Sequence, residues 1–185
     1  MKEKTAELIA QLRSNAVEAF DRLIEQYGDR LYWHIRRVVV NHEEAEDVLQ
    51  ETFAKAYTSI TDFRGDTESS LTAWLYRIAT NIAISALRKR KKWAFASLDS
   101  VRGDLLATFE HEVEPSADEI VVRLQKAILA LPTKQRLVFN MRYYDELSFE
   151  QISQATGQSV STLKTNYHYA VQKIKEQVRV VELED

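Results

Sequence analysis

Two helix signals separated by a short break near the C-terminus constrain the fold of this chain more than any other feature. Ser148 and Gln151 have the spacing of a capping box, which favours the start of a helix. Gly157 interrupts that helix, and Ser159 and Ser161 can both cap the one that follows. The pattern predicts a compact helix-turn-helix.

The second helix of this motif has an apolar stripe and an opposite polar face. The residues predicted to be buried, at helical spacing, are Val160, Leu163, Tyr167, Ala170, Val171 and Ile174. The residues predicted to reach phosphates or base edges are Ser161, Thr162, Lys164, Thr165, His168, Tyr169 and Gln172. A helix with these side chains suits the major groove, so this part of the chain is predicted to bind duplex DNA.

The overall charge is unusual for a protein that binds DNA by itself. The formal net charge is −3 over 185 residues, and the excess of acidic side chains lies in residues 97–116. Affinity for the phosphate backbone depends on the positive charge presented to it, so free DNA should be bound weakly. We therefore expect a larger partner to supply the missing affinity.

The composition argues against several other classes of protein. The chain has no cysteine, which removes disulfides, thiolate zinc sites and thiol nucleophiles. Its four histidines are not paired at ligand spacing, so neither a metal site nor another cofactor is predicted. No apolar run is long enough for a membrane span, and the first residues lack the apolar segment of a secretion signal. These features predict a cytoplasmic protein without membrane insertion.

Glycine and proline are scarce and strand-like alternation is hard to find, so an all-α fold is predicted. Three helical patterns occupy the first half, over about 16–40, 42–60 and 71–92. Their apolar faces match, which predicts a three-helix bundle.

A capping box at Ser116 and Glu119 begins the second half, which continues into the helix-turn-helix. Between the halves the sequence is acidic and has no sustained period. We therefore predict two small helical domains, at 1–96 and 116–185, joined by an acidic flexible linker at 97–115.

Five short segments are specific to one known family. They are D-V-L-Q-E-T-F at 47–53, F-R-G-D at 63–66, W-L-Y-R-I-A-T-N at 74–81, L-P-T-K-Q-R-L-V-F at 131–139 and S-F-E-Q-I-S at 148–153. With these segments in this order, nearly the whole chain resembles the extracytoplasmic-function (ECF) group of bacterial sigma factors, part of the sigma-70 family. The resemblance implies a non-enzymatic factor that binds core RNA polymerase, directs it to promoter DNA and promotes strand opening.

The resemblance assigns polymerase binding to the second predicted helix. Asp47, Gln50 and Glu51 lie at i, i+3 and i+4, opposite the apolar stripe. An acidic patch suits a basic coiled coil. By the resemblance, its partner is the clamp coiled coil of the largest catalytic subunit of the polymerase. On spacing alone, a solvated charged face is the alternative interpretation.

The resemblance places capture of the promoter's minus-ten element between residues 63 and 92. Holding unpaired bases out of the stack requires hydrogen-bonding side chains, aromatic surfaces and a basic path for the backbone. The predicted residues are Phe63, Arg64, Tyr76, Arg77, Asn81, Arg88, Lys89, Arg90, Lys91 and Lys92. Asn81 matches the family residue that contacts a flipped base. Tyr76 is the preferred stacking residue, whereas Trp74 is expected to pack in the core.

The resemblance also implies that the second domain reads the minus-thirty-five element. The recognition helix departs from the arginine-rich composition common in the family, with Lys164, Asn166, Tyr167 and His168 in its first turns. Tyr167 is expected in the core and His168 at the groove. An anti-sigma protein that occludes the polymerase- and DNA-binding faces is a further partner that the resemblance implies.

Two other functions remain open on the residues alone. A stand-alone DNA-binding regulator would use the same helix-turn-helix, but it would leave residues 1–96 without a role. A nucleic-acid enzyme would need a metal held by Asp47 and Glu51, or by Asp62 and Asp66. The chain has neither a glycine-rich phosphate loop nor an activated nucleophile, which disfavours the enzyme.

Overall fold

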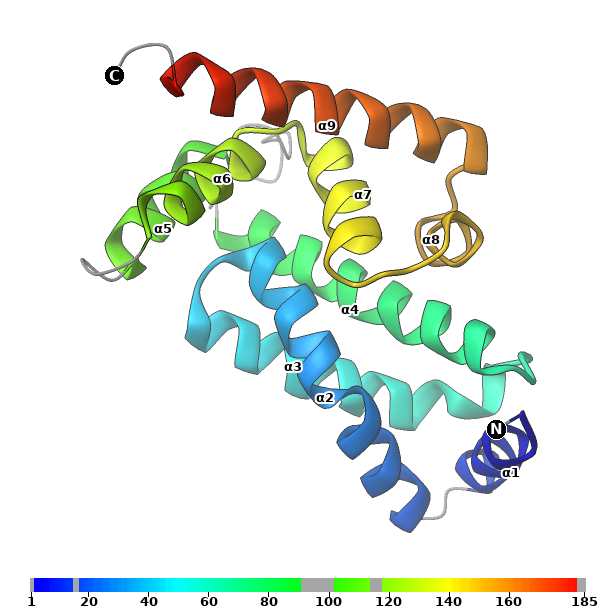
Figure 1. The fold of residues 1–185 in the computed structure, drawn as a ribbon. Coiled ribbons are helices and arrows are strands. Elements are labelled where there is room, and N and C mark those ends of the chain that lie inside the picture. Colours follow the sequence, from blue (N-terminus) through cyan, green and yellow to red (C-terminus); the bar gives the residue numbers. More distant parts are fainter. Residues whose placement is uncertain (1, 15–16, 91–101, 114–117, 183–185) are drawn as a thin grey trace.

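The computed structural model describes residues 2–14, 17–90, 102–113 and 118–182. Over these ranges the chain forms nine α-helices and one 3-10 turn, with no strand (Figure 1). The all-α prediction is therefore confirmed. None of the described helices is both long enough and apolar enough to cross a bilayer.

Four helices make up the first half. They are α1 (Lys2–Arg13), α2 (Val17–Val39), α3 (His42–Ser59) and α4 (Glu68–Arg90), with the 3-10 turn η1 (Ile60–Asp62) after α3. Helices α2, α3 and α4 match the predicted bundle. Helix α1 is an addition that packs against α2, α4 and η1 and buries Leu8, Ile9 and Leu12.

Caps and buried side chains explain how this bundle forms. Asn41 caps α3, because its side-chain oxygen accepts a hydrogen bond from the Glu44 backbone N–H at 2.8 Å. Tyr27 of α2 is buried, with its hydroxyl 3.2 Å from Thr72 Oγ1 on α4. Burial raises the pKa of Tyr27, so the phenol stays neutral and can bond across the helix contact.

The second half contains the predicted helix-turn-helix. Its helices are α5 (Arg102–Glu112), α6 (Glu119–Leu129), α7 (Thr133–Tyr143), α8 (Phe149–Thr156) and α9 (Val160–Glu182). The Ser148–Gln151 capping box is confirmed, with reciprocal bonds of 3.1 and 2.8 Å. Gly157 ends α8 at φ 73°, in the left-handed region that glycine adopts without steric cost.

The segment between the halves has more regular structure than the sequence suggested. Residues 102–112 form α5, which packs on α6 and fully buries Leu105. Leu105, Leu106 and Phe109 supply the short apolar stripe that makes this packing favourable. The predicted cap Ser116 lies outside the described residues. Asp118 caps α6 instead, and accepts from the Ile120 N–H at 2.8 Å.

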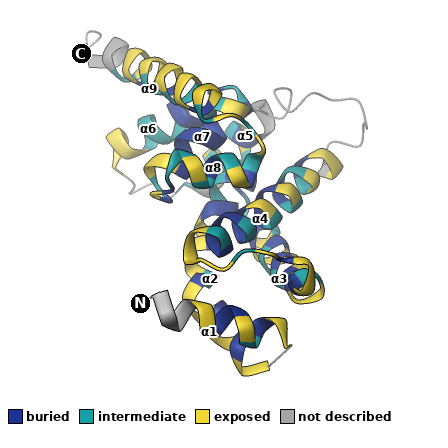
Figure 2. Cartoon of the chain, turned by 90° about the vertical axis from the view of Figure 1, so that its right-hand side faces the viewer, coloured by how far each residue is buried: buried dark blue, intermediate teal, exposed yellow. Residues whose placement is uncertain are grey.

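The two halves pack directly against each other. Helix α8 packs across α4, and α7 contacts α2 (Figure 1). One apolar core continues from Leu75 of α4 to Ile152 of α8 and Leu163 of α9. Buried residues likewise run on from α2 and α4 into α7 and α8 in Figure 2. A second, smaller core joins α6, α7 and α9.

Candidate nucleic-acid interface

Helix α1 holds the loop between η1 and α4 in place. Arg13 of α1 donates from Nη2 to the carbonyl oxygens of Phe63, at 3.1 Å, and Gly65, at 2.7 Å. Its guanidinium carbon also lies 5.8 Å from the centroid of the Phe63 ring, within cation–π range. Arg13 therefore fixes the backbone of this loop, which contains Phe63 and Arg64 of the predicted minus-ten site and is called the minus-ten loop below. The sequence pattern gave no indication of this role, since α1 itself was not predicted.

Gly65 has no room for a side chain in this loop. A Cβ atom at this position would lie 2.3 Å from Ser70 Oγ and 2.4 Å from Phe63 Cζ. Ser70 and Thr67 each accept a bond from the other's backbone N–H, both at 3.2 Å. The Phe63 ring packs on Trp74 with centroids 5.0 Å apart. These contacts give the loop one compact shape.

The polar residues predicted for minus-ten binding lie on one exposed stripe of α4. The exposed members are Arg77, Asn81, Arg88 and Lys89, with Arg64 exposed in the preceding loop. Residues three or four apart share a helix face, so these side chains can follow one nucleic-acid strand. Arg90 is the last residue of α4, and Lys91 and Lys92 lie outside the described residues.

Two aromatic residues predicted for the same site are buried in this conformation. The prediction of Tyr76 as the preferred stacking residue does not fit this conformation, because its side chain is fully buried and α8 of the second domain packs on α4. Its ring packs on His34 with centroids 4.8 Å apart. Burial, followed by the nearby Asp145 charge, raises the pKa of Tyr76. Phe63 is buried between Arg13 and Trp74, so neither ring is free to stack on a base.

The predicted acidic patch is exposed on α3. Asp47, Gln50 and Glu51 face away from the buried side of the helix. Glu51 also lines a small cavity of about 190 Å³ together with Asn81 and Lys89 of α4. The acidic face of α3 and the polar stripe of α4 therefore meet along one edge of the bundle.

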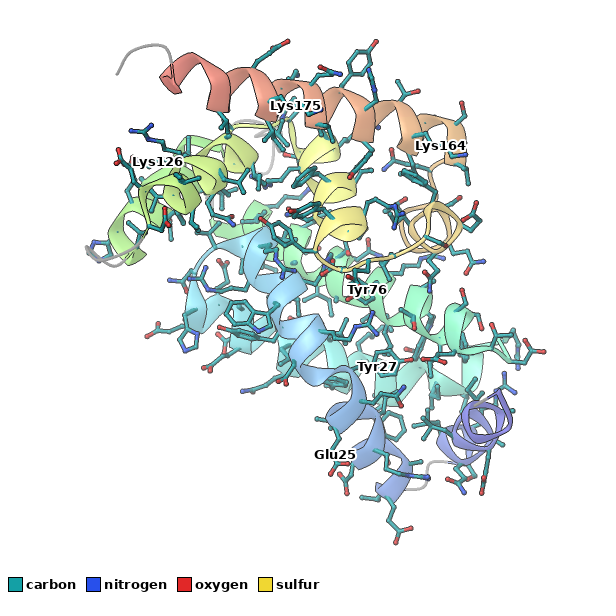
Figure 3. All side chains as sticks on the ribbon, in the orientation of Figure 1. Glu25, Tyr27, Tyr76, Lys126, Lys164 and Lys175 are labelled. Carbon is teal, nitrogen blue, oxygen red and sulfur yellow. The ribbon has the colours of Figure 1, made fainter. Side chains whose placement is uncertain are left out.

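The groove-facing residues predicted for α9 are all exposed. They are Ser161, Thr162, Lys164, Thr165, His168, Tyr169 and Gln172. Tyr167 is half-buried against Phe139 and Phe149, as expected. Lys164 lies near the start of α9, with its Nζ 5.9 Å from the centroid of the Phe149 ring (Figure 3).

These features define an all-α protein with one face suited to a basic protein partner and two suited to nucleic acid. Among the described residues, Asp, Glu and His side chains do not gather in groups of three that could hold a metal ion. Residues 23–93 match the family model of Sigma-70 region 2, and residues 122–174 match Sigma-70, region 4. Helix α1 precedes both matched ranges.

Full-length relatives extend the match. The chain is 33% identical to the ECF RNA polymerase sigma factor SigW of Bacillus subtilis, over 92% of this chain and 95% of that protein. It is 29% identical to the RNA polymerase sigma-H factor of Pseudomonas aeruginosa, over 93% of this chain and 92% of that protein. The chain belongs to the ECF group of the sigma-70 family and is an RNA polymerase sigma factor.

Solved structures share the fold. CnrH in complex with the cytosolic domain of CnrY has a TM-score of 0.71 and 22% identity, covering 95% of this chain and 97% of that one. The sigma factor RpoE in complex with the anti-sigma factor NepR, from Bartonella quintana, has a TM-score of 0.65 and 21% identity. That alignment covers 87% of this chain and 97% of RpoE.

Proposed function

We propose that three exposed faces divide the work of this sigma factor. Asp47, Gln50 and Glu51 on α3 bind the clamp coiled coil of core RNA polymerase. The α4 stripe and its preceding loop capture the minus-ten element, and the outer face of α9 reads the minus-thirty-five element. The observation that carries this assignment is that polar side chains suited to each task are exposed on three separate faces, while the apolar stripes of the same helices are buried. Bond-making chemistry belongs to the polymerase.

The polymerase contact is supported by charge. Asp47 and Glu51 are separated by one helical turn and are both exposed, so they can meet a basic partner together. Reversing both charges should abolish assembly with core polymerase and leave the bundle folded, because neither residue is in the core.

A pull-down with core polymerase tests this contact. The D47K/E51K variant should fail to assemble. A matched control reverses Asp21 and Glu25, an exposed pair one turn apart on α2, and should assemble normally. Normal assembly of D47K/E51K would overturn the assignment.

The minus-ten contact is centred on Asn81. Its exposed amide can both donate and accept, which is what recognition of a flipped base requires. Asn81→Ala should lose strand opening, measured by permanganate reactivity of the promoter, while core binding persists. Gln154→Ala removes an exposed amide from α8 and serves as the control. A normal permanganate pattern for Asn81→Ala would count against the site.

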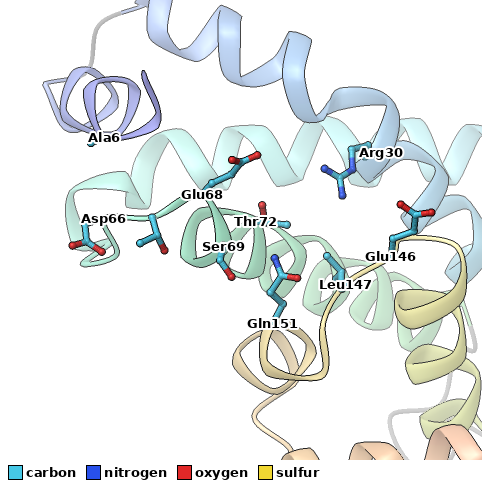
Figure 4. Close-up of a pocket in the computed structure, with 10 residues that line it drawn as sticks. Ala6, Arg30, Asp66, Glu68, Ser69, Thr72, Glu146, Leu147 and Gln151 are labelled. Carbon is cyan, nitrogen blue, oxygen red and sulfur yellow. The ribbon is translucent and has the colours of Figure 1, made fainter. Parts of the chain in front are cut away.

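An anti-sigma partner is also proposed. A cleft of about 860 Å³ opens between the domains, lined by Arg30 and Glu68 of the first and Glu146 and Gln151 of the second (Figure 4). A protein segment seated there would touch both domains at once. A solved structure of this fold, the sigma factor RpoE in complex with the anti-sigma factor NepR, supports the existence of such a partner.

A further inference from the structure

A cavity of about 330 Å³ lies where the C-terminal end of α2 meets α5, α6 and α7 (Figure 1). Its volume falls within the range of small-molecule sites, which combine apolar walls with a few polar groups that face the ligand. None of the described residues that line this cavity belongs to the three faces of the proposed function. The cavity is therefore a separate candidate site.

Aromatic and aliphatic side chains make up most of the cavity wall. Phe109 of α5, Ile128 of α6 and Tyr144 at the end of α7 line it. Trp33 of α2 also lines it, although 55% of its surface is exposed. An exposed tryptophan ring at a cavity offers apolar surface and a π face that a planar ligand can cover. These rings favour an aromatic ligand over a flexible polar one.

Two other lining residues hold the Tyr144 ring in place. Its hydroxyl accepts a hydrogen bond from Gln125 Nε2 at 3.1 Å, and the guanidinium carbon of Arg37 lies 4.4 Å from the centroid of its ring. Burial raises the pKa of Tyr144, so the phenol stays neutral. This part of the wall is formed before a ligand arrives, which lowers the cost of binding.

Val40 contributes to the wall from the turn between α2 and α3. Its φ is 68°, a left-handed conformation that is an outlier for a β-branched residue. Its N–H donates to the Arg36 carbonyl at 2.9 Å, and its side chain is buried. Surrounding contacts must maintain such a conformation, and strained residues of this kind are concentrated at functional sites. The strain at Val40 therefore agrees with a functional role for the cavity.

One polar group in the wall lacks a hydrogen-bond partner. Asn140 of α7 is only 1% exposed and lines the cavity, and its Oδ1 bonds to none of the residues that the structure describes. A buried amide oxygen without a partner is destabilising, and nearly all such groups in proteins are paired. An O–H or N–H donor on a ligand would satisfy Asn140 Oδ1. The cavity therefore suits a ligand that carries a donor.

Two guanidinium groups make the cavity favourable to an anion. Arg36 and Arg37 both line it, whereas its described lining residues include neither Asp nor Glu. Arg37 uses one of its five N–H donors for Asp145 Oδ1, at 2.9 Å, and that carboxylate offsets its charge. Arg36 adds a second guanidinium, whose planar fork matches the geometry of a carboxylate. The charge of the wall thus favours a carboxylate on the ligand.

We propose that this cavity binds a small aromatic carboxylate that carries a hydroxyl or N–H donor. The ring of the ligand lies among Trp33, Phe109 and Tyr144. Its carboxylate meets Arg36, and its donor bonds to Asn140 Oδ1. Each of the three requirements depends on a different lining group, so each can be removed separately. The inference does not depend on the proposed function, because the free protein is sufficient to test it.

Three small probes test the requirements one at a time. The first, para-hydroxyphenylacetate, has the ring, the carboxylate and the donor. Phenylacetate lacks the hydroxyl donor, and para-hydroxyphenylethanol lacks the carboxylate. The probe with all three groups should bind with a Kd of about 1 mM, as expected for so small a ligand. Each of the other two should bind roughly tenfold more weakly, because it leaves one polar group of the wall without a partner.

Nuclear magnetic resonance of the tryptophan indole N–H groups reports where the probe binds. The chain has three tryptophans, and the spectrum of W33F assigns the Trp33 signal. This signal should shift and saturate as para-hydroxyphenylacetate is added to the full chain. Trp74 is an internal control, because it packs on Phe63 at the start of α4, and its signal should not move.

Two variants assign the ends of the ligand. N140L replaces the amide with an apolar side chain of similar size, so it should bind para-hydroxyphenylacetate and phenylacetate equally. R36Q should lose most of the preference for the carboxylate over the alcohol. R22Q, at an exposed arginine near the other end of α2, is the matched control and should keep both preferences of the natural protein.

Several results would overturn the proposal. They are a Trp33 signal that does not shift or does not saturate, an equal shift at Trp74, equal binding of the three probes, and a folded N140L that still prefers the hydroxyl. Circular dichroism establishes whether the variants are folded. If N140L is not folded, the three probes decide on the natural protein alone, because that comparison changes the ligand and leaves the chain as it is.

Discussion

Arg13→Ala should loosen the minus-ten loop, although Arg13 lies outside the part of the chain that matches either sigma family model. The substitution removes two hydrogen bonds from a charged donor, to the carbonyls of Phe63 and Gly65, and the cation–π contact with Phe63. Shielded bonds of this type contribute about 1.5–3 kcal/mol each. Arg13 is exposed, and solvent screening lowers the expected total to about 1–2 kcal/mol.

Two assays measure this effect. Thermal unfolding should show a fall in Tm of roughly 3–6 °C. Transcription from a promoter library should show weaker discrimination at the minus-ten element, with the minus-thirty-five preference unchanged. Arg13→Lys should have a Tm and a minus-ten discrimination between those of R13A and the natural protein, since one ammonium group cannot reproduce the planar guanidinium. Arg123→Ala, at an arginine of α6 that pairs with the exposed Glu119 in the second domain, is the control. If R13A melts like the natural protein and keeps its minus-ten preference, α1 does not position the loop.

Three other sites give further predictions. Replacing Lys164, Thr165 and His168 together with alanine should change discrimination at the minus-thirty-five element by roughly 1–3 kcal/mol for each base-specific interaction that is removed, and a promoter library should show unchanged minus-ten preference. The pKa of Tyr76 is raised in the folded protein, so above pH 10 its phenol ionises in the unfolded state before it does in the folded state, and the free energy of unfolding falls as pH rises. Tyr76→Phe should make this fall shallower in alkaline unfolding titrations. Gly157→Ala should cost about 1 kcal/mol in chemical unfolding, because its φ of 73° is unfavourable for alanine even though a Cβ would meet nothing within 4 Å.

Much of the fold was predictable because helix caps and apolar stripes in the sequence match the helices and buried residues of the structure. The capping box at Ser148 and Gln151 and the left-handed Gly157 act within a few residues, so sequence spacing alone locates α8. The exposed faces of α3 and α9 were predictable for a similar reason, since the polar face of a helix lies opposite its buried apolar stripe and is exposed to solvent.

The remaining features depend on contacts between distant segments. Arg13 bonds to residues 50 and 52 positions away, and Asp145 bonds to His34 111 positions away. The hydrophobic periodicity of a helix does not indicate contacts between residues so far apart in the sequence. Tyr76 shows the consequence, because its position beside the polar stripe of α4 suggested exposure, whereas the second domain packs over it. Helix α5 was missed because its apolar stripe is short and lies in an acidic segment.

The sigma-factor assignment is tested most directly by transcription reconstituted from purified core polymerase, this protein and a randomised promoter library. We expect transcripts with defined start sites and two selected elements only when both proteins are present, together with weak binding of the protein alone to the selected DNA. Tight, sequence-specific binding of the free protein, combined with no change in the start sites chosen by core polymerase, would identify a stand-alone regulator and contradict the assignment.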